Sequence, residues 1–142
     1  MKYVRWALGV LVGLYALTAL YHMVLTVGHK TGMAMSLPGA ADMGGLMDAI
    51  AWWQVVVFLL AVIGYGVAAF RLLRGGKALA PYAAAFVLDA IGWLTIRSTA
   101  AYQSAFSAEQ LQMDYYVMGA LLIGLALVWW TERDASPTVV AA

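Results

Sequence analysis

The chain has 142 residues, of which 65% are apolar and only 11% are charged, against the roughly 25% charge of soluble domains. The net charge of +1 and the scattered Lys and Arg residues exclude an extended phosphate-binding surface, so we expect no nucleic-acid partner. Because there is no cysteine, disulfides, thiol catalysis, iron–sulfur clusters and zinc-thiolate sites are excluded.

Four apolar stretches account for most of the chain, in keeping with its mean hydropathy of +0.85. Each is close to the ~20 residues that an α-helix needs to cross a hydrocarbon layer of ~30 Å. The predicted spans are residues 6–27, 49–70, 81–97 and 114–131. We therefore predict an all-α integral membrane protein, in which residues 1–142 form a single four-helix transmembrane domain with a short, flexible tail at 132–142.

The first two connections contain turn signals. In the first, residues 28–48, an apolar group next to the second span favours a short helical turn at the membrane surface; the group is Leu46, Met47 and Ile50. The second connection, residues 71–80, is short and contains Gly75 and Gly76. A short glycine turn between two spans predicts that they pack side by side as an antiparallel pair.

The third connection contains a helix start signal. Ser107 and Gln110 have the spacing of a capping box, which predicts that the last helix begins near Ala108, before the apolar span itself. Four spans joined in this way predict an antiparallel bundle that runs up-down-up-down.

The distribution of cations predicts the orientation, because Lys and Arg resist translocation across a membrane. With the N-terminus inside, six cations lie on the inner side and two, Lys30 and Arg97, on the outer side. The inner six are Lys2, Arg5, Arg71, Arg74, Lys77 and Arg133. Both termini are therefore predicted to be cytoplasmic, in a multi-pass protein of a bacterial inner membrane.

Asp89 is the most informative residue for function, because it falls near the middle of the third span. A charged Asp at a helix centre costs about 2.5–3.5 kcal/mol on insertion scales, so its side chain should face protein or water. Trp93 and Arg97 follow at intervals of four residues, which places all three on one stripe of the helix.

The first span has a polar face and a small-residue face. Tyr15, Thr18 and His22 cluster on one side of the predicted helix, at the depth of Asp89 or further outward. The opposite side has a GxxxG pattern that permits a close helix contact. We predict a helix-packing interface there, formed by Gly9, Gly13 and Ala16.

Together the two polar stripes predict a membrane-buried polar site. It would serve as a proton relay between Asp89 and His22, or as a pocket for the polar group of a quinone or lipid, with Arg97 holding an acidic or carbonyl oxygen. The alternative is structural, with the same residues forming interhelical hydrogen bonds that stabilise the bundle by about 0.6 kcal/mol each.

The outer connection has the donor types of a copper site. Imidazole and thioether groups suit Cu(I), and the candidate ligands are His29, Met33 and Met35. Methionine also fills irregular packing gaps, which is the plainer interpretation. A single histidine, His22 or His29, is a further candidate as a haem ligand if a partner chain supplies the second one.

No nucleophile, base and orienting group stand at a recognisable spacing, which favours a non-catalytic role. Our leading hypothesis is an accessory or scaffolding subunit of a larger membrane complex. One alternative is a small oligomeric transporter or channel in which Asp89 carries a proton or cation. The other is a binder of quinone, metal or haem in an electron-transfer complex. The expected partners are the lipid bilayer and other membrane subunits or further copies of the chain; the sequence identifies no particular cofactor.

Overall fold

The computed structural model describes residues 1–33 and 43–134, and over these residues the chain is helical, with no β-strand. The helices are α1 (Lys2–Lys30), α2 (Gly44–Ala49), α3 (Trp52–Arg74), α4 (Leu79–Arg97), α5 (Ala100–Ala105) and α6 (Ala108–Asp134). Four of them, α1, α3, α4 and α6, are long and apolar enough to span a membrane. This confirms the prediction of an all-helical chain with four candidate membrane-spanning helices.

A local signal in the sequence placed the start of the last helix correctly, whereas α3 continues four residues beyond its predicted end at residue 70. The last helix begins at Ala108, where the Ser107 amide donates to Gln110 Oε1 (2.9 Å) and the Gln110 amide donates to Ser107 Oγ (3.3 Å). The helical turn expected before the second span is α2. Gly75 ends α3 with a φ of 77°, in the left-handed region that glycine adopts without a Cβ clash.

Helix α6 extends further than the sequence predicted. Residues 132–134 were assigned to the tail, but α6 continues to Asp134, because Glu132 is held against the start of α4. Residues 135–142 lie outside the described part of the chain. The short helix α5 was also not predicted; Thr99 begins it by accepting a hydrogen bond from the Tyr102 amide (3.3 Å).

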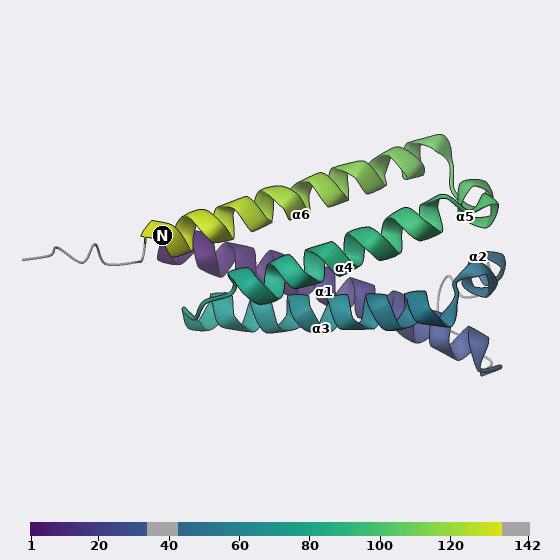
Figure 1. The fold of residues 1–142 in the computed structure, drawn as a ribbon, viewed down its shortest axis with the longest axis horizontal. Coiled ribbons are helices and arrows are strands. Elements are labelled where there is room, and N and C mark those ends of the chain that lie inside the picture. The colour runs from purple at the N-terminus through teal and green to yellow at the C-terminus, as the bar shows by residue number, and fades with distance from the viewer. Residues whose placement is uncertain (34–42, 135–142) are drawn as a thin grey trace, which may run out of the picture.

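The long helices lie side by side along one axis and define two ends of the molecule (Figure 1). We call one the turn end: it contains the start of α1, the turn between α3 and α4, and the end of α6. We call the other the cap end, because α2 and α5 lie across it. There α2 and α5 pack against α3 and α4 through Leu46, Ile50, Val55, Ile96 and Tyr102.

Small residues bring α1, α3 and α4 close together. A Cβ on Gly9 would lie 3.2 Å from the Ala69 carbonyl oxygen, and one on Gly64 would lie 2.8 Å from the Ala85 Cβ. Ala68, between these contacts, is fully buried. The core at this level is therefore made by close backbone approach, which is the typical packing mode of helices in lipid.

The buried residues of helix α6 are confined to one half of its length. Its buried residues, Leu121, Gly124, Val128 and Thr131, all lie in the half nearer the turn end. The Tyr82 hydroxyl of α4 donates to the Leu121 carbonyl oxygen (2.9 Å). It lies directly over Gly124, where an added Cβ would clash with the hydroxyl oxygen. Toward the cap end α6 diverges from α1 and α3 (Figure 1), which leaves room between the helices for a site.

Candidate functional site

The candidate site is centred on the buried carboxyl group of Asp89, which is only 6% exposed. Tyr15 of α1 donates a hydrogen bond to its Oδ2 (2.6 Å), and Tyr65 of α3 donates to the same oxygen (3.2 Å). The two tyrosine rings meet edge to face with their centroids 5.2 Å apart. Three helices therefore converge on one oxygen atom of Asp89.

The other carboxyl oxygen of Asp89 has a different environment. Oδ1 accepts no hydrogen bond from the described residues, and it is not among the side-chain oxygens buried without a partner. Because Asp89 lines a cavity, this oxygen faces open space. The tyrosine pair fixes the orientation of the carboxyl group and leaves one acceptor free.

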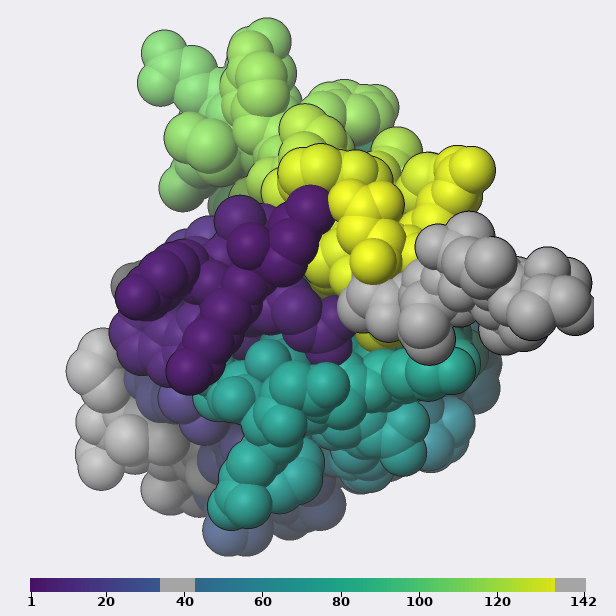
Figure 2. Space-filling view, turned by 90° about the vertical axis from the view of Figure 1, so that its left-hand side faces the viewer, coloured from purple at the N-terminus to yellow at the C-terminus, as the bar shows by residue number. Residues whose placement is uncertain are grey.

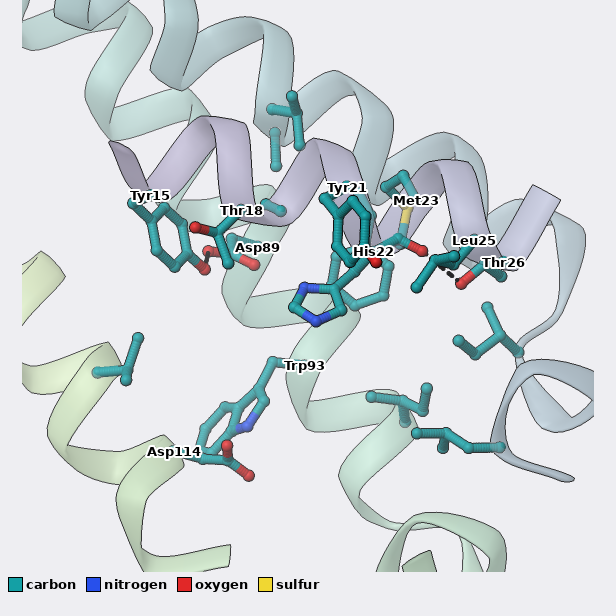
Figure 3. A pocket seen from close by; sticks show the side chains of 18 of the residues that line it. Tyr15, Thr18, Tyr21, His22, Met23, Leu25, Thr26, Asp89, Trp93 and Asp114 are labelled. Atoms are coloured by element: carbon teal, nitrogen blue, oxygen red, sulfur yellow. Dashed lines mark hydrogen bonds between the residues drawn. The ribbon is translucent and has the colours of Figure 1, made fainter. Parts of the chain in front are cut away.

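The cavity itself has a volume of about 560 Å³ and lies between α1, α4 and α6 (Figure 3). Most of its wall is apolar, including Leu25, Phe58 and Ile96. Residues of α2 and α5, such as Met47 and Tyr102, close it at the cap end. The volume lies within the range of about 300–1,000 Å³ that is usual for small-molecule sites.

The cavity opens sideways between α1 and α6. Several of its lining residues, Thr18, Tyr21, His22 and Val117, are exposed on this flank. All four belong to helices that are candidates for spanning the membrane. The opening of the cavity therefore lies between two candidate membrane spans.

His22 and Trp93 face each other across the cavity (Figure 3). The His22 ring stacks edge-on with Tyr21 at 5.9 Å, and its nitrogen atoms form no hydrogen bond with the described residues. Trp93 Nε1 is buried and likewise has no hydrogen bond of ordinary geometry in that part of the chain, although it lies near the Tyr102 hydroxyl. The imidazole of His22 is therefore the group on this side of the cavity that is suited to bind an oxygen atom of a ligand.

Of the predicted polar site, five residues line this cavity: Asp89, Trp93, His22, Thr18 and Tyr15. Thr18 contributes little polarity, because its hydroxyl donates to the Leu14 carbonyl oxygen of its own helix (3.0 Å).

Arg97 is not in the cavity wall, contrary to the predicted cluster. Its Nη1 donates to Asp114 Oδ2 (3.2 Å) and to the Leu111 carbonyl oxygen (2.9 Å) of α6, and its guanidinium lies over the Tyr115 ring at 4.2 Å. These contacts join α6 to α4. The prediction missed this because Asp114 was treated only as the first residue of the fourth span.

Tyr102 of α5 completes the contact with α6. Its hydroxyl donates to Asp114 Oδ2 (2.5 Å), and burial, with this hydrogen bond, raises the pKa of the Tyr102 hydroxyl above its usual value. The group therefore stays protonated and remains a donor across the physiological pH range. Asp114 and Tyr102 also line the cavity, so this contact forms part of its wall near the cap end.

The predicted packing face of α1 is covered by α3 within the same chain. Gly9 lies against Leu73 and Ala69. A Cβ added to Gly13 would lie 3.7 Å from the Ala69 Cβ, and Ala16 is buried. This face is therefore occupied and does not offer a surface for another subunit.

Two of the three candidate metal ligands, His29 and Met33, lie in the described part of the chain. His29 Nε2 pairs with Asp48 Oδ1 of α2 (2.8 Å), and Met33 is 60% exposed. Met35 lies outside the described residues. Within residues 1–33 and 43–134, no group of three or more His, Cys, Asp or Glu side chains is placed to hold a metal ion. The structure thus adds no support to a metal site here.

Sequence reasoning missed several residues of the site, among them Tyr65, Tyr102 and Asp114. Tyr65 lies in an apolar span and faces inward, where a tyrosine needs a partner for its hydroxyl when it is buried. Such a tyrosine near the depth of Asp89 was a usable signal. The pairing of Asp114 with Arg97 had none, because it depends on the rotation of α6.

No family model, curated protein or solved structure matches this chain. The fold places the chain in a broad class: it is an all-helical protein with four candidate membrane-spanning helices.

Proposed function

We propose that the protein binds a lipid-soluble ligand with a hydroxyl-bearing polar ring, of the quinol and quinone class, in the cavity beside Asp89. The observation that carries the proposal is the free Oδ1 atom of a carboxyl group whose Oδ2 is held by two tyrosines, at the wall of an apolar cavity that opens between two candidate membrane spans. This proposal extends one of the three hypotheses drawn from the sequence, that the chain binds a quinone, metal or haem.

The residues of the cavity suit the two ends of such a ring. A ring hydroxyl would donate to Asp89 Oδ1, and the oxygen at the opposite side would accept from the imidazole of His22. The apolar wall would hold the ring, and an isoprenoid or acyl chain would leave through the flank between α1 and α6. Buried ligand oxygens paired in this way provide specificity in an otherwise apolar site.

The test uses the Asp89→Asn variant. Because Tyr15 and Tyr65 both donate to one oxygen, the amide carbonyl must take that place, and the NH2 group then replaces the free acceptor. The protein should still fold, but we expect its affinity for a short-chain quinol to fall about tenfold, which corresponds to the loss of one buried hydrogen bond of about 1.4 kcal/mol. Calorimetric titration of the purified protein under reducing conditions measures this affinity.

Three further variants control the experiment. Asp48→Asn removes a carboxylate outside the cavity and should leave the affinity unchanged. Trp93→Phe should abolish the saturable quenching of fluorescence by the oxidised quinone, whereas Trp53→Phe, outside the cavity wall, should not. Absence of saturable binding, or equal losses in Asp89→Asn and Asp48→Asn, would contradict the proposal.

A second candidate function is the accessory subunit of a larger membrane complex. It is favoured by the half of α6 nearer the cap end, which has no buried residue although it belongs to a candidate span. A helix of a partner subunit would complete its packing. Purification from native membranes in nanodiscs separates the two functions: fixed-ratio partners without an extractable quinone favour the accessory role, and a bound quinone without partners favours the first.

We also propose that the helices cross a bacterial inner membrane as an antiparallel, up-down-up-down bundle with the turn end in the cytoplasm. The support is the concentration of cations at that end, including Lys2, Arg74 and Lys77. Hydrogen bonds there join segments far apart in sequence: Arg5 donates to the Gly76 carbonyl oxygen, and the Ala78 amide donates to Glu132 Oε1.

Single cysteines test this orientation, because the chain has none of its own. Ser104→Cys in α5 should react with a membrane-impermeant maleimide added to intact cells. Gly76→Cys should react only after the membrane is opened; its added Cβ would have ordinary contacts of 3.6 Å. The reverse labelling pattern would overturn the orientation, and labelling of both sites from outside would overturn the antiparallel arrangement.

A further inference from the structure

A second cavity, separate from the one beside Asp89, lies at the turn end. It has a volume of about 540 Å³ and is formed by the start of α1, the end of α3 and the end of α6. Figure 2 shows the face of the molecule on which these three segments meet. Its lining includes the side chains of Lys2, Arg5 and Arg74, against one carboxylate, that of Asp134.

Two of these cations are positioned by other contacts. Arg5 Nη2 donates to the Gly76 carbonyl oxygen, which uses one of the five N–H donors of a guanidinium and fixes the side chain at the cavity. The Arg74 guanidinium lies over the Phe70 ring at 5.1 Å. Planar, oriented guanidinium groups are the donors that suit the oxygen atoms of a phosphate.

Apolar side chains flank the cations. Trp6 is 59% exposed and Leu73 is 46% exposed, and both line the same cavity. A site with a cationic floor and an adjoining exposed apolar surface suits a molecule that has both an anionic group and hydrocarbon chains.

The depth of the site also fits a lipid. Helix α1 has 29 residues, which corresponds to ~43 Å at 1.5 Å per residue, close to the ~40–45 Å of a bilayer with its headgroup regions. Residues in the first turn of α1 therefore lie at the level of the headgroups. Trp6, one turn further in, is at the depth where tryptophan side chains prefer to lie.

We propose that this cavity binds the phosphodiester headgroup of an anionic lipid, with Lys2, Arg5 and Arg74 around the phosphate and the acyl chains along Trp6 and Leu73. Asp134 disfavours a second negative charge at its side of the cavity, which points to a headgroup with a single phosphodiester. The site is independent of the cavity beside Asp89 and of any ligand there.

Native mass spectrometry of the full chain in detergent, with added phosphatidylglycerol or phosphatidylcholine of the same acyl chains, tests the proposal. We expect retained phosphatidylglycerol and little phosphatidylcholine. Because one cation near an anionic lipid surface changes affinity about fivefold, the double variant Lys2→Gln, Arg74→Gln should bind phosphatidylglycerol about 25-fold more weakly. Arg5 is left in place, since its loss would also remove the contact with Gly76.

The matched control removes two cations of the same end that do not line the cavity, Lys77→Gln and Arg133→Gln. It should bind phosphatidylglycerol within about twofold of the unaltered chain, as should Asp89→Asn, whose effect belongs to the other cavity. Equal binding of the two lipids, or an equal loss in the control, would overturn the proposal. So would displacement of the lipid by millimolar inorganic phosphate, which would identify the cavity as a site for a soluble anion.

Discussion

Replacing Gly64 with leucine is expected to lower the free energy of unfolding by about 3 kcal/mol, at the upper end of the usual cost of overpacking. A Cβ at this position would lie 2.8 Å from the Ala85 Cβ and 3.2 Å from the Pro81 carbonyl oxygen. The second neighbour is backbone, so relief requires α3 and α4 to move apart. Unfolding in a titration of mixed detergent micelles with dodecyl sulfate, followed by circular dichroism, measures the change.

Gly66→Leu is the matched control, because it adds the same side chain to the same helix where nothing lies within 4 Å of the added Cβ. We expect a change within about 0.5 kcal/mol, as for other substitutions away from packed features. If the two variants lose the same stability, helix α3 does not pack on α4 through Gly64, and the positions of Tyr65 and Asp89 would have to be reconsidered.

Replacing Glu132 with alanine is expected to cost about 2 kcal/mol of stability. Helix α4 has no capping side chain of its own, since Ala78 precedes it. Glu132 of α6 supplies the missing acceptor: its Oε1 accepts hydrogen bonds from the backbone amides of Ala78 (2.5 Å) and Leu79 (3.0 Å). A carboxylate at a helix N-terminus also interacts favourably with the helix dipole. The same unfolding titration measures the loss.

Two further variants isolate the contact made by Glu132. Glu132→Gln keeps an oxygen acceptor and loses the charge, so it should lose only about half as much stability as Glu132→Ala. Glu109→Ala removes a carboxylate from the exposed first turn of the same helix and should change stability by less than about 0.5 kcal/mol. Equal effects of Glu132→Ala and Glu109→Ala would show that α6 is not held to the start of α4.

Features that depend on short stretches of chain could be predicted from the sequence. Ser107 and Gln110 lie three residues apart and bond to each other whatever the rest of the protein does, so the start of α6 was predictable. The four spans were predictable because a membrane requires every backbone hydrogen bond to be made within the helix, over a length set by the bilayer.

The residues that make up the Asp89 site could be predicted only in part. The polar residues of one helix share a face by periodicity alone, which is why Tyr15, Thr18 and His22 were grouped correctly. The position of Arg97 could not be inferred in this way. Its partner Asp114 lies on another helix, and which face of that helix meets α4 depends on packing around Gly124 and Tyr82.

The sequence by itself thus determined that the chain forms four long apolar helices, where one of them begins, and which residues share a face, because these properties follow from local hydrogen bonding and helical periodicity. Only the tertiary structure decided that Tyr65 shares Asp89 with Tyr15, that Glu132 caps α4, and that α6 diverges to open a cavity. Those contacts join helices whose relative rotation and depth are set by the close approach of small residues such as Gly9 and Gly64. The cooperative fit of all the helices at once determines that approach, and no single segment encodes it.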